Sequence, residues 1–301
     1  MTLRELQYLV EVARLGNFRR AAEVCNVSQP TLSAQLRKLE DELGVVLVER
    51  GARRVILTAA GEEILVHAQR MLAEANDIRT LAARHRSPDT GRLRLGAFHT
   101  LGPYLLPRLV PRIGAAFPGL ELELVEEKSA QLLEKLRVGR LDVALLALPV
   151  AEGYQVEPLF TEEFFLAVPA GHPLAARNSV QLSELGGQRL MLLEDGHCLR
   201  DQALNLCQRW GAEETAGFRA SSLETLRQMV SAGMGITLLP ALATRGPLAQ
   251  AGALRFLPVV DDPAPSRTIG LVWRRSSALA PLLRDLAALI RATAAEITAA
   301  A

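Results

Sequence analysis

The sequence predicts an α/β protein whose N-terminal part is an all-α winged helix-turn-helix, joined to the rest of the chain by a long linker helix. Three observations predict this class. Short, well-capped helical patterns fill residues 1–45, one unbroken helical pattern runs from Thr58 to about Arg86, and strand-like apolar runs then alternate with helical runs. A chain of 301 residues is long enough for two or three domains, each with its own core.

Composition and charge exclude several classes of protein. The chain is 49% hydrophobic and 22% charged with a net charge of +1, its longest apolar run (143–151) is too short to cross a bilayer, and residues 1–6 lack the apolar core of a signal peptide. We therefore expect a cytoplasmic protein with no membrane partner. None of the three lysines follows a glycine, which excludes a P-loop. Three cysteines without a CxxC pair or a histidine cluster argue against zinc, so we expect no metal and no cofactor.

The first 45 residues predict three short helices around one core. Leu3–Leu15 has apolar residues on one face, Asn17 can cap a second helix at 18–25, and Ser28 can cap a third. The third helix carries an apolar stripe of Leu32, Leu36, Leu39 and Leu43. Two short helices joined by a tight turn, the second of which exposes small polar and basic side chains, are typical of a helix-turn-helix.

The third helix and the hairpin after it carry the candidate DNA contacts. The hairpin (46–57) has arginines at its tip, a position suited to phosphates or to the minor groove. The alternative is that these arginines form the solvated surface of a three-helix bundle. The predicted DNA-binding residues are Ser28, Gln29, Pro30, Thr31, Ser33, Arg37 and Lys38 of the third helix and Arg50, Arg53 and Arg54 of the hairpin.

The long helix after Thr58 has the apolar spacing of a coiled-coil seam. Its apolar residues alternate by four and three, at Ile64, Ala68, Met71, Ala75, Ile78 and Ala82. A helix of this length is about 40 Å long, and no domain of its own buries the stripe. We therefore expect it to pair with a second copy, which implies a dimer on a two-fold-related site.

Strand-like and helical runs alternate after a linker at residues 87–91. The predicted strands are 92–96, 120–125, 143–148, 164–168, 190–193, 236–239 and 268–273, and the predicted helices are 103–117, 130–139, 200–211, 223–233 and 278–297. This alternation predicts parallel sheets flanked by helices, with ligands bound beyond the carboxyl ends of the strands.

Two of the three cysteines, Cys198 and Cys207, lie nine positions apart on a predicted helix, and the first is flanked by His197 and Arg200. A thiol beside cationic side chains tends toward the reactive thiolate. Nine helical residues rise by about 13 Å, whereas a disulfide needs Cα atoms within roughly 7 Å, so pairing requires the helix to come apart. The alternative is that both are buried structural cysteines. Cys25 is expected to be a packing residue.

The head resembles that of the LysR-type transcriptional regulators. The resemblance is carried by Asn17-Phe18, Ala21-Ala22, Val27–Ser33, Leu36, Leu39-Glu40, Leu43-Gly44, Leu47, Arg50 and Leu57–Gly61. It implies that the chain continues into a two-lobed sensing domain like that of type 2 periplasmic binding proteins. By that analogy the winged helix-turn-helix takes residues 1–58, the linker helix 59–90 and the sensing domain 91–301, with lobe one at 91–162 and 268–301 and lobe two at 163–267.

The cysteine segment is similar to that of the peroxide-sensing members of this family. The matching residues are Glu194–Ala203, Cys207, Ser222–Arg227, Gly235–Ala243 and Arg267–Val272. In those proteins hydrogen peroxide oxidises the first cysteine to a sulfenic acid, and the second condenses with it to a disulfide. The resemblance implies that Cys198 is the peroxidatic residue and Cys207 the resolving one.

The same resemblance implies an environment for the thiol. Arg267 would lower its pKa, His197 would add charge or a proton unless it is a hydrogen-bonded structural histidine, and the Thr100 hydroxyl would contact peroxide unless it caps a helix. The complete candidate set is Thr100, Ser129, His197, Arg200, Asp201 and Arg267. The chain departs from the expected pattern at Phe98 and His99, where Ile-Pro is expected, and at Ser129, where threonine is expected.

The implied partners are those of a transcriptional activator rather than of an enzyme. They are double-stranded promoter DNA, further copies of the chain in a dimer of dimers, RNA polymerase, hydrogen peroxide as the signal, and a thiol reductant such as glutaredoxin or thioredoxin. One alternative is a LysR-type regulator that responds to a small metabolite between its lobes, with silent cysteines. Another is a thiol enzyme such as a peroxidase. The predicted DNA-binding head argues against an enzyme.

Overall fold

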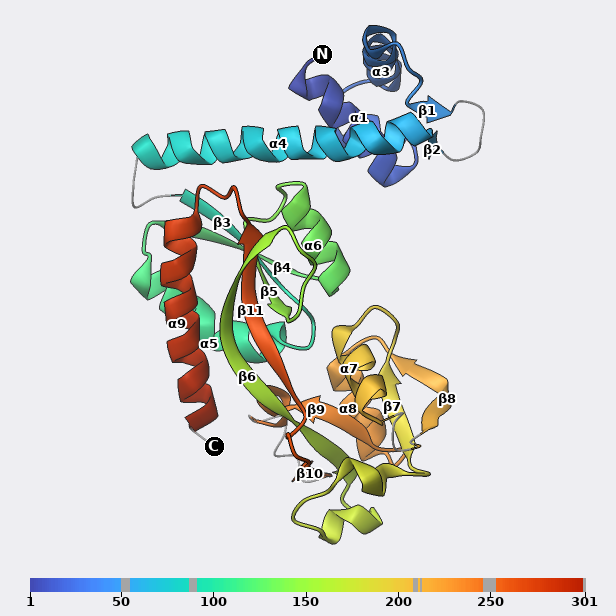
Figure 1. Ribbon diagram of the computed structural model, residues 1–301, viewed down its shortest axis with the longest axis vertical. Coiled ribbons are helices and arrows are strands. Elements are labelled where there is room, and N and C mark those ends of the chain that lie inside the picture. Colours follow the sequence, from blue (N-terminus) through green and yellow to red (C-terminus); the bar gives the residue numbers. More distant parts are fainter. Residues whose placement is uncertain (50–54, 87–90, 208–210, 212, 246–252, 300–301) are drawn as a thin grey trace. The chain divides into compact units, whose positions relative to one another are not determined.

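The computed structural model describes residues 1–49, 55–86, 91–207, 211, 213–245 and 253–299. They form two compact units, one containing the head with the long helix and one containing the α/β domain (Figure 1). In these ranges no helix combines the length and the apolar character that crossing a bilayer requires.

Three helices and a hairpin form the head, as the sequence predicts. They are α1 (Leu3–Leu15), α2 (Phe18–Val24), α3 (Gln29–Leu43), β1 (Val48–Glu49) and β2 (Ile56–Leu57). The side chains of Asn17 and Ser28 accept hydrogen bonds from backbone N–H groups of α2 and α3, which confirms both predicted caps. Leu32, Leu36 and Leu39 are buried and Cys25 packs against the same core, but Leu43, in the last turn of α3, is 36% exposed and lies outside the stripe.

The outer face of α3 is open to solvent. Ser28, Gln29, Pro30, Thr31, Arg37 and Lys38 are exposed, and Ser33 is half-buried. Lys38 differs from the others because its Nζ pairs with Glu5 of α1 at 3.1 Å, so part of its charge is used inside the head. The wing arginines Arg50, Arg53 and Arg54 lie outside the described residues.

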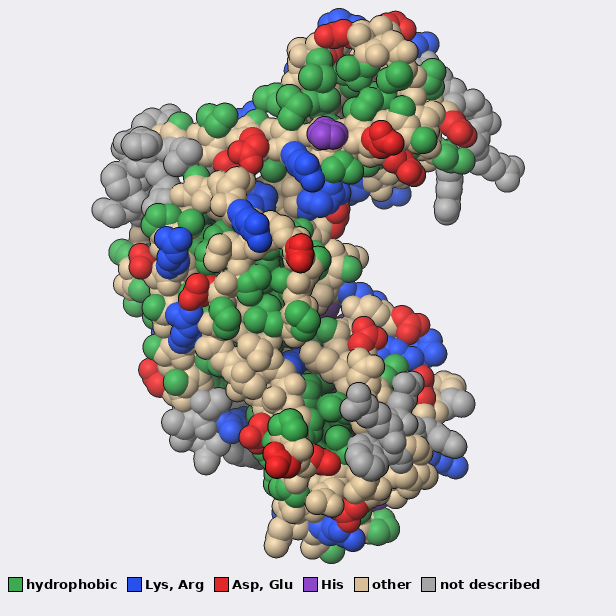
Figure 2. All heavy atoms as spheres, in the orientation of Figure 1, with side chains coloured by type: hydrophobic (Ala, Val, Ile, Leu, Met, Phe, Trp, Pro, Cys, Tyr) green, Lys and Arg blue, Asp and Glu red, His purple; other side chains and the backbone are tan. Residues whose placement is uncertain are grey.

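The long helix α4 (Ala59–Arg86) is continuous, and the Thr58 hydroxyl caps its first turn. Ala68 is buried in the core of the head and Ile64 packs against it, so the expectation that no domain buries the stripe is wrong for these two residues. Met71 and Ile78 are 44% and 67% exposed. Hydrophobic side chains reach the surface of this unit in Figure 2. A second helix packed on α4 would bury these apolar side chains, as the heptad spacing predicts.

The α/β domain contains one large sheet and one small one. The large sheet has the order β10-β6-β11-β5-β3-β4, with β9 beside β6, and the small sheet pairs β7 with β8. The strands are β3 (Gly91–Ala97), β4 (Leu120–Glu126), β5 (Val143–Ala147), β6 (Tyr154–Pro169), β7 (Arg189–Leu193), β8 (Glu213–Ala220), β9 (Thr237–Pro240), β10 (Leu254–Pro258) and β11 (Ser266–Arg274). The helices are α5 (Gly102–Ala116), α6 (Ser129–Arg137), α7 (Cys198–Cys207), α8 (Leu223–Ser231) and α9 (Ala280–Ala299), with 3-10 turns η1 (Pro173–Ala176), η2 (Leu182–Leu185) and η4 (Ala241–Thr244).

The prediction of parallel sheets is only partly right. Strand β3 is parallel to β4 and β5, and β7 is parallel to β8, but β6 is antiparallel to β9, β10 and β11, and β11 is antiparallel to β5. The reason is that β11, from the C-terminal part of the chain, lies between β5 and β6 and is antiparallel to both. The alternation of runs also does not predict β8, β10 or the first half of β6. The long strands β6 and β11 run through both lobes (Figure 1).

Candidate functional site

Cys198 is the first residue of α7, which follows β7 through a tight loop. Gly196 in this loop has a φ of +89°, a left-handed conformation that side chains disfavour. Cys198 is a free, half-buried thiol, and Cys207 ends the same helix, although its side chain lies outside the described residues. Nine helical steps separate the two Cα atoms by about 13 Å, so the helix holds the cysteines apart, as predicted.

The positive charge of Arg267, a buried residue of β11, lowers the pKa of this thiol. Arg267 is 3% exposed, and it donates from Nη1 to the Thr100 hydroxyl at 3.0 Å and from Nη2 to the Thr100 carbonyl oxygen at 3.1 Å. Its guanidinium also lies 5.2 Å from the centroid of the Phe98 ring. The Thr100 hydroxyl is thus engaged by Arg267 and does not cap α5, whose N-cap residue is Leu101, so the helix-cap alternative is wrong.

The sequence reasoning missed Glu162, which balances the charge of Arg267. Its carboxylate is fully buried, accepts from Arg267 Nε at 2.9 Å and accepts from the Leu242 N–H at 3.0 Å. The register pairs Glu162 directly with Arg267 across the antiparallel strands β6 and β11. The sequence signal was weak, because Glu162 stands between Thr161 and Glu163 and does not interrupt an apolar run.

The resting thiol of Cys198 is not activated in the way the flanking residues predict. Burial raises its pKa above the ordinary value, while Arg267 and the Ser129 hydroxyl lower it, and exposed Asp201 raises it slightly. Desolvation of the thiolate outweighs the favourable neighbours. The expectation of a thiolate is therefore wrong for this conformation.

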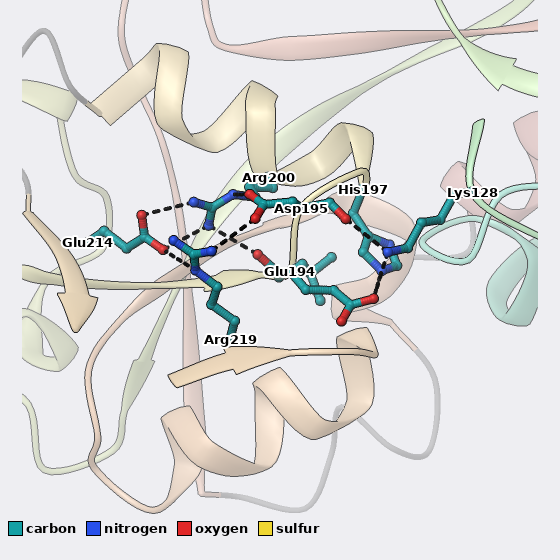
Figure 3. A network of polar contacts seen from close by, with 8 residues as sticks. Lys128, Glu194, Asp195, His197, Arg200, Glu214 and Arg219 are labelled. Carbon is teal, nitrogen blue, oxygen red and sulfur yellow. Dashed lines mark hydrogen bonds and ion pairs between the residues drawn. The ribbon is translucent and has the colours of Figure 1, made fainter. Parts of the chain in front are cut away.

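Neither His197 nor Arg200 supplies the predicted positive charge. Burial lowers the pKa of His197, which favours its neutral form. Arg200 donates from both Nη atoms to Glu214 of β8 at 2.9 Å, and its Nε lies 2.9 Å from Asp195 (Figure 3). Its charge is thus balanced by carboxylates, and its role is to fasten the first turn of α7 to β8.

Two buried polar atoms near the thiol have no hydrogen-bond partner among the described residues: Nε2 of His197 and Nδ1 of His99. Ser129 is the first residue of α6, and its hydroxyl lowers the pKa of the Cys198 thiol. The rings of His99 and His197 are edge to face, with centroids 5.4 Å apart. Buried polar atoms are normally satisfied, so this cluster can bind a small polar molecule beside the sulfur.

A cavity of about 330 Å³ adjoins this cluster at His99. Its other walls include Tyr104 of α5, Leu223 of α8 and Ile297 of α9, and Cys198 does not line it. This space is much larger than a peroxide molecule needs. In the alternative of a metabolite-responsive regulator, the small metabolite would bind in this cavity.

The raised pKa of Cys198 predicts a pH profile. In a Cys25→Ser/Cys207→Ser variant, alkylation of Cys198 by iodoacetamide should accelerate about tenfold per unit between about pH 6 and pH 8, because the thiolate fraction rises tenfold per unit below the pKa. Mass spectrometry of quenched samples gives the rate. A plateau inside that range would mean that the thiol is already ionised, contrary to the effect of its burial.

The head and the α/β domain each match a family of known proteins. Residues 3–62 match the bacterial regulatory helix-turn-helix protein, lysR family, and residues 86–295 match the LysR substrate binding domain. The chain is 48% identical to the DNA-binding transcriptional dual regulator OxyR of Escherichia coli (strain K12) over 293 residues, which cover 97% of this chain and 95% of that protein.

Solved structures resemble the chain over nearly its full length. A cysteine-to-aspartate variant of full-length OxyR from Pseudomonas aeruginosa has a TM-score of 0.75 and 40% identity, with 97% of this chain and 98% of that chain covered. An H2O2-bound cysteine-to-serine mutant of Corynebacterium glutamicum OxyR has a TM-score of 0.68 and 38% identity, with 99% and 94% covered. The chain therefore belongs to the LysR family of bacterial helix-turn-helix transcriptional regulators.

Proposed function

We propose that this chain is a transcriptional activator that senses hydrogen peroxide and is switched by a reversible disulfide between Cys198 and Cys207. The observation that carries the proposal is the free thiol of Cys198 at the start of α7, beside Arg267 and the hydroxyl of Ser129. The relatives support it, because one is the regulator OxyR and a solved mutant of another OxyR binds H2O2. The chain acts as a switch without a turnover product, so it is not an enzyme.

The chemistry has two balanced steps. In the first, the Cys198 thiolate attacks one oxygen of hydrogen peroxide, an S–O bond forms, the O–O bond breaks, and the leaving hydroxide takes up a proton to become water. Arg267 stabilises the thiolate, and the polar atoms of Ser129 and His197 are available to the peroxide oxygens. In the second, the Cys207 thiolate attacks the sulfenic sulfur, an S–S bond forms, the S–O bond breaks, and the leaving hydroxide takes up a proton to become a second water.

The second step requires α7 to unwind, because its ends are too far apart for a bond. The disulfide would then hold a rearranged segment, which changes contacts between copies and so repositions the DNA-reading heads. A thiol reductant such as glutaredoxin or thioredoxin would restore the two thiols and the helix.

The DNA contacts and the assembly are part of the same proposal. The exposed residues of α3, from Ser28 to Lys38, would enter the major groove, and the wing arginines would contact the backbone. The exposed apolar stripe of α4, at Met71 and Ile78, supports a dimer through this helix, and pairing of sensing domains would give a dimer of dimers. The proposal includes the domain limits 1–58, 59–90 and 91–301, and RNA polymerase as the partner that the chain would contact at the promoter.

Peptide mapping tests the switch directly, because trypsin cleaves after Arg200, between the two cysteines. After one equivalent of peroxide, we expect a disulfide between peptides 190–200 and 201–209. Cys207→Ser should stop at an oxidised Cys198, Cys198→Ser should not respond, and Cys25→Ser should behave like the parent. If the linked peptide does not form, or if Cys198→Ser still changes its promoter footprint with peroxide, the proposal fails.

The metabolite alternative has one observation in its favour, the cavity of about 330 Å³ beside His99. It predicts that some small ligand shifts DNA binding while the Cys198→Ser variant keeps that response. The peroxidase alternative predicts sustained peroxide consumption when a thiol reductant is supplied. Both the response to a ligand and the consumption of peroxide are measured on the parent and on Cys198→Ser.

A further inference from the structure

Lys128 joins lobe one to the loop that precedes Cys198. Its Nζ donates to Glu194 Oε1 at 2.6 Å and to the backbone oxygen of Asp195 at 2.9 Å (Figure 3). The backbone of Lys128 is itself fixed at the start of α6, where its carbonyl oxygen accepts from the N–H groups of Gln131 and Leu132. A cation from one lobe therefore holds a loop of the other lobe at two points.

The aliphatic part of Lys128 lies against Gly196, two residues before the reactive thiol. A Cβ at position 196 would be 3.1 Å from Lys128 Cδ, closer than ordinary van der Waals contact. The φ of +89° at Gly196 brings the loop to this approach. The contact with Lys128 thus includes packing as well as charge.

The next residue, Ser129, acts on the Cys198 thiol itself. Lys128 and Ser129 are consecutive, so a loop held by Lys128 also keeps Cys198 beside the Ser129 hydroxyl. On the other side of the loop, Asp195 pairs with Arg200 and Arg219 within lobe two. Unwinding of the first turn of α7 would move this loop and therefore separate Lys128 from Glu194.

We propose that Lys128 is a positioning residue of the redox switch, a latch that keeps Cys198 beside Ser129 and slows the unwinding that delivers it to Cys207. This inference rests on the proposed function and adds to it which of the two steps Lys128 affects. The latch acts on the second step, disulfide closure, and leaves the first step, sulfenic acid formation, nearly unchanged.

The test separates the two steps. Full-length protein is mixed with excess peroxide and quenched at intervals with N-ethylmaleimide, and the sulfenic and disulfide forms of peptides 190–200 and 201–209 are counted by mass. For Lys128→Gln we expect closure about two- to fivefold faster, the range for a partly exposed ion pair. Sulfenic acid formation is measured in a Cys207→Ser background. Its rate should change by less than about twofold, because the loss of a partly exposed ion pair costs too little free energy to displace Cys198 most of the time.

Three controls distinguish a latch from general loosening. Lys128→Arg should restore slow closure, Glu194→Gln should reproduce the Lys128→Gln rate, and Lys135→Gln, which removes the same charge from the last turn of α6, should match the parent. Raising salt from about 0.05 to about 0.5 M should accelerate closure more in the parent than in Lys128→Gln, because only the parent also has the Lys128–Glu194 pair to be screened. Equal closure rates in the parent and Lys128→Gln would overturn the latch, whereas absence of any linked peptide in the parent would overturn the proposed function.

Discussion

Replacing Arg267 by alanine should slow oxidation of Cys198 by at least about tenfold, the factor that one unit of pKa represents. Arg267 is the positively charged group that lowers the pKa of the Cys198 thiol, so its loss would raise that pKa further. The same substitution leaves Glu162 as a fully buried carboxylate without its partner. Breaking a buried pair in this way typically costs about 3–5 kcal/mol of folding free energy.

Glu162→Gln provides the matched control for this prediction. It breaks the same buried pair and so also lowers stability, but it leaves the Arg267 charge unbalanced beside the thiol. We therefore expect a lower pKa and faster oxidation, the opposite sign to Arg267→Ala. Denaturant unfolding gives the stabilities, and stopped reactions with peroxide give the rates. If both variants slow oxidation in proportion to their loss of stability, the arginine acts only through the fold.

Features that depend on nearby residues could be predicted from the sequence. The caps at Asn17 and Ser28, the buried leucines of α3 and the continuous helix α4 all follow from residues within a few positions of one another. The direction of β6 and β11 could not be predicted in this way, because it depends on which strands become neighbours. A regular alternation of runs does not reveal that β11 inserts between β5 and β6, antiparallel to both.

The candidate site shows the same division. Cys198 and Arg267 were identified from motifs, and the structure brings both to one place. Glu162 became visible only through the register of two strands distant in sequence. The charge state of the thiol could not be predicted from its flanking residues, because burial is a property of the fold and here outweighs the nearby cation. Arg200, two residues after Cys198, pairs with Glu214 and not with the thiol.

Leu199→Ala should accelerate disulfide closure by at least about tenfold, if α7 must leave its place for Cys198 to reach Cys207. Leu199 is 2% exposed and packs in one core of lobe two, together with Leu226 of α8. Truncating a buried leucine costs about 2–5 kcal/mol. When α7 has undocked before the S–S bond forms, this cost applies to the starting state and not to the state that closes, so the barrier falls.

Leu226→Ala is the control that makes the measurement decisive. Leu226 is 1% exposed in the same core, but it belongs to α8, which the switch does not need to unwind. Its truncation should lower the stability of the domain by a similar amount and leave the closure rate near that of the parent, because its packing is kept during closure. Closure is measured from preformed sulfenic acid, so that changes in the first step do not contribute. If Leu199→Ala closes no faster than Leu226→Ala, α7 remains docked during closure and Cys207 must approach by another route.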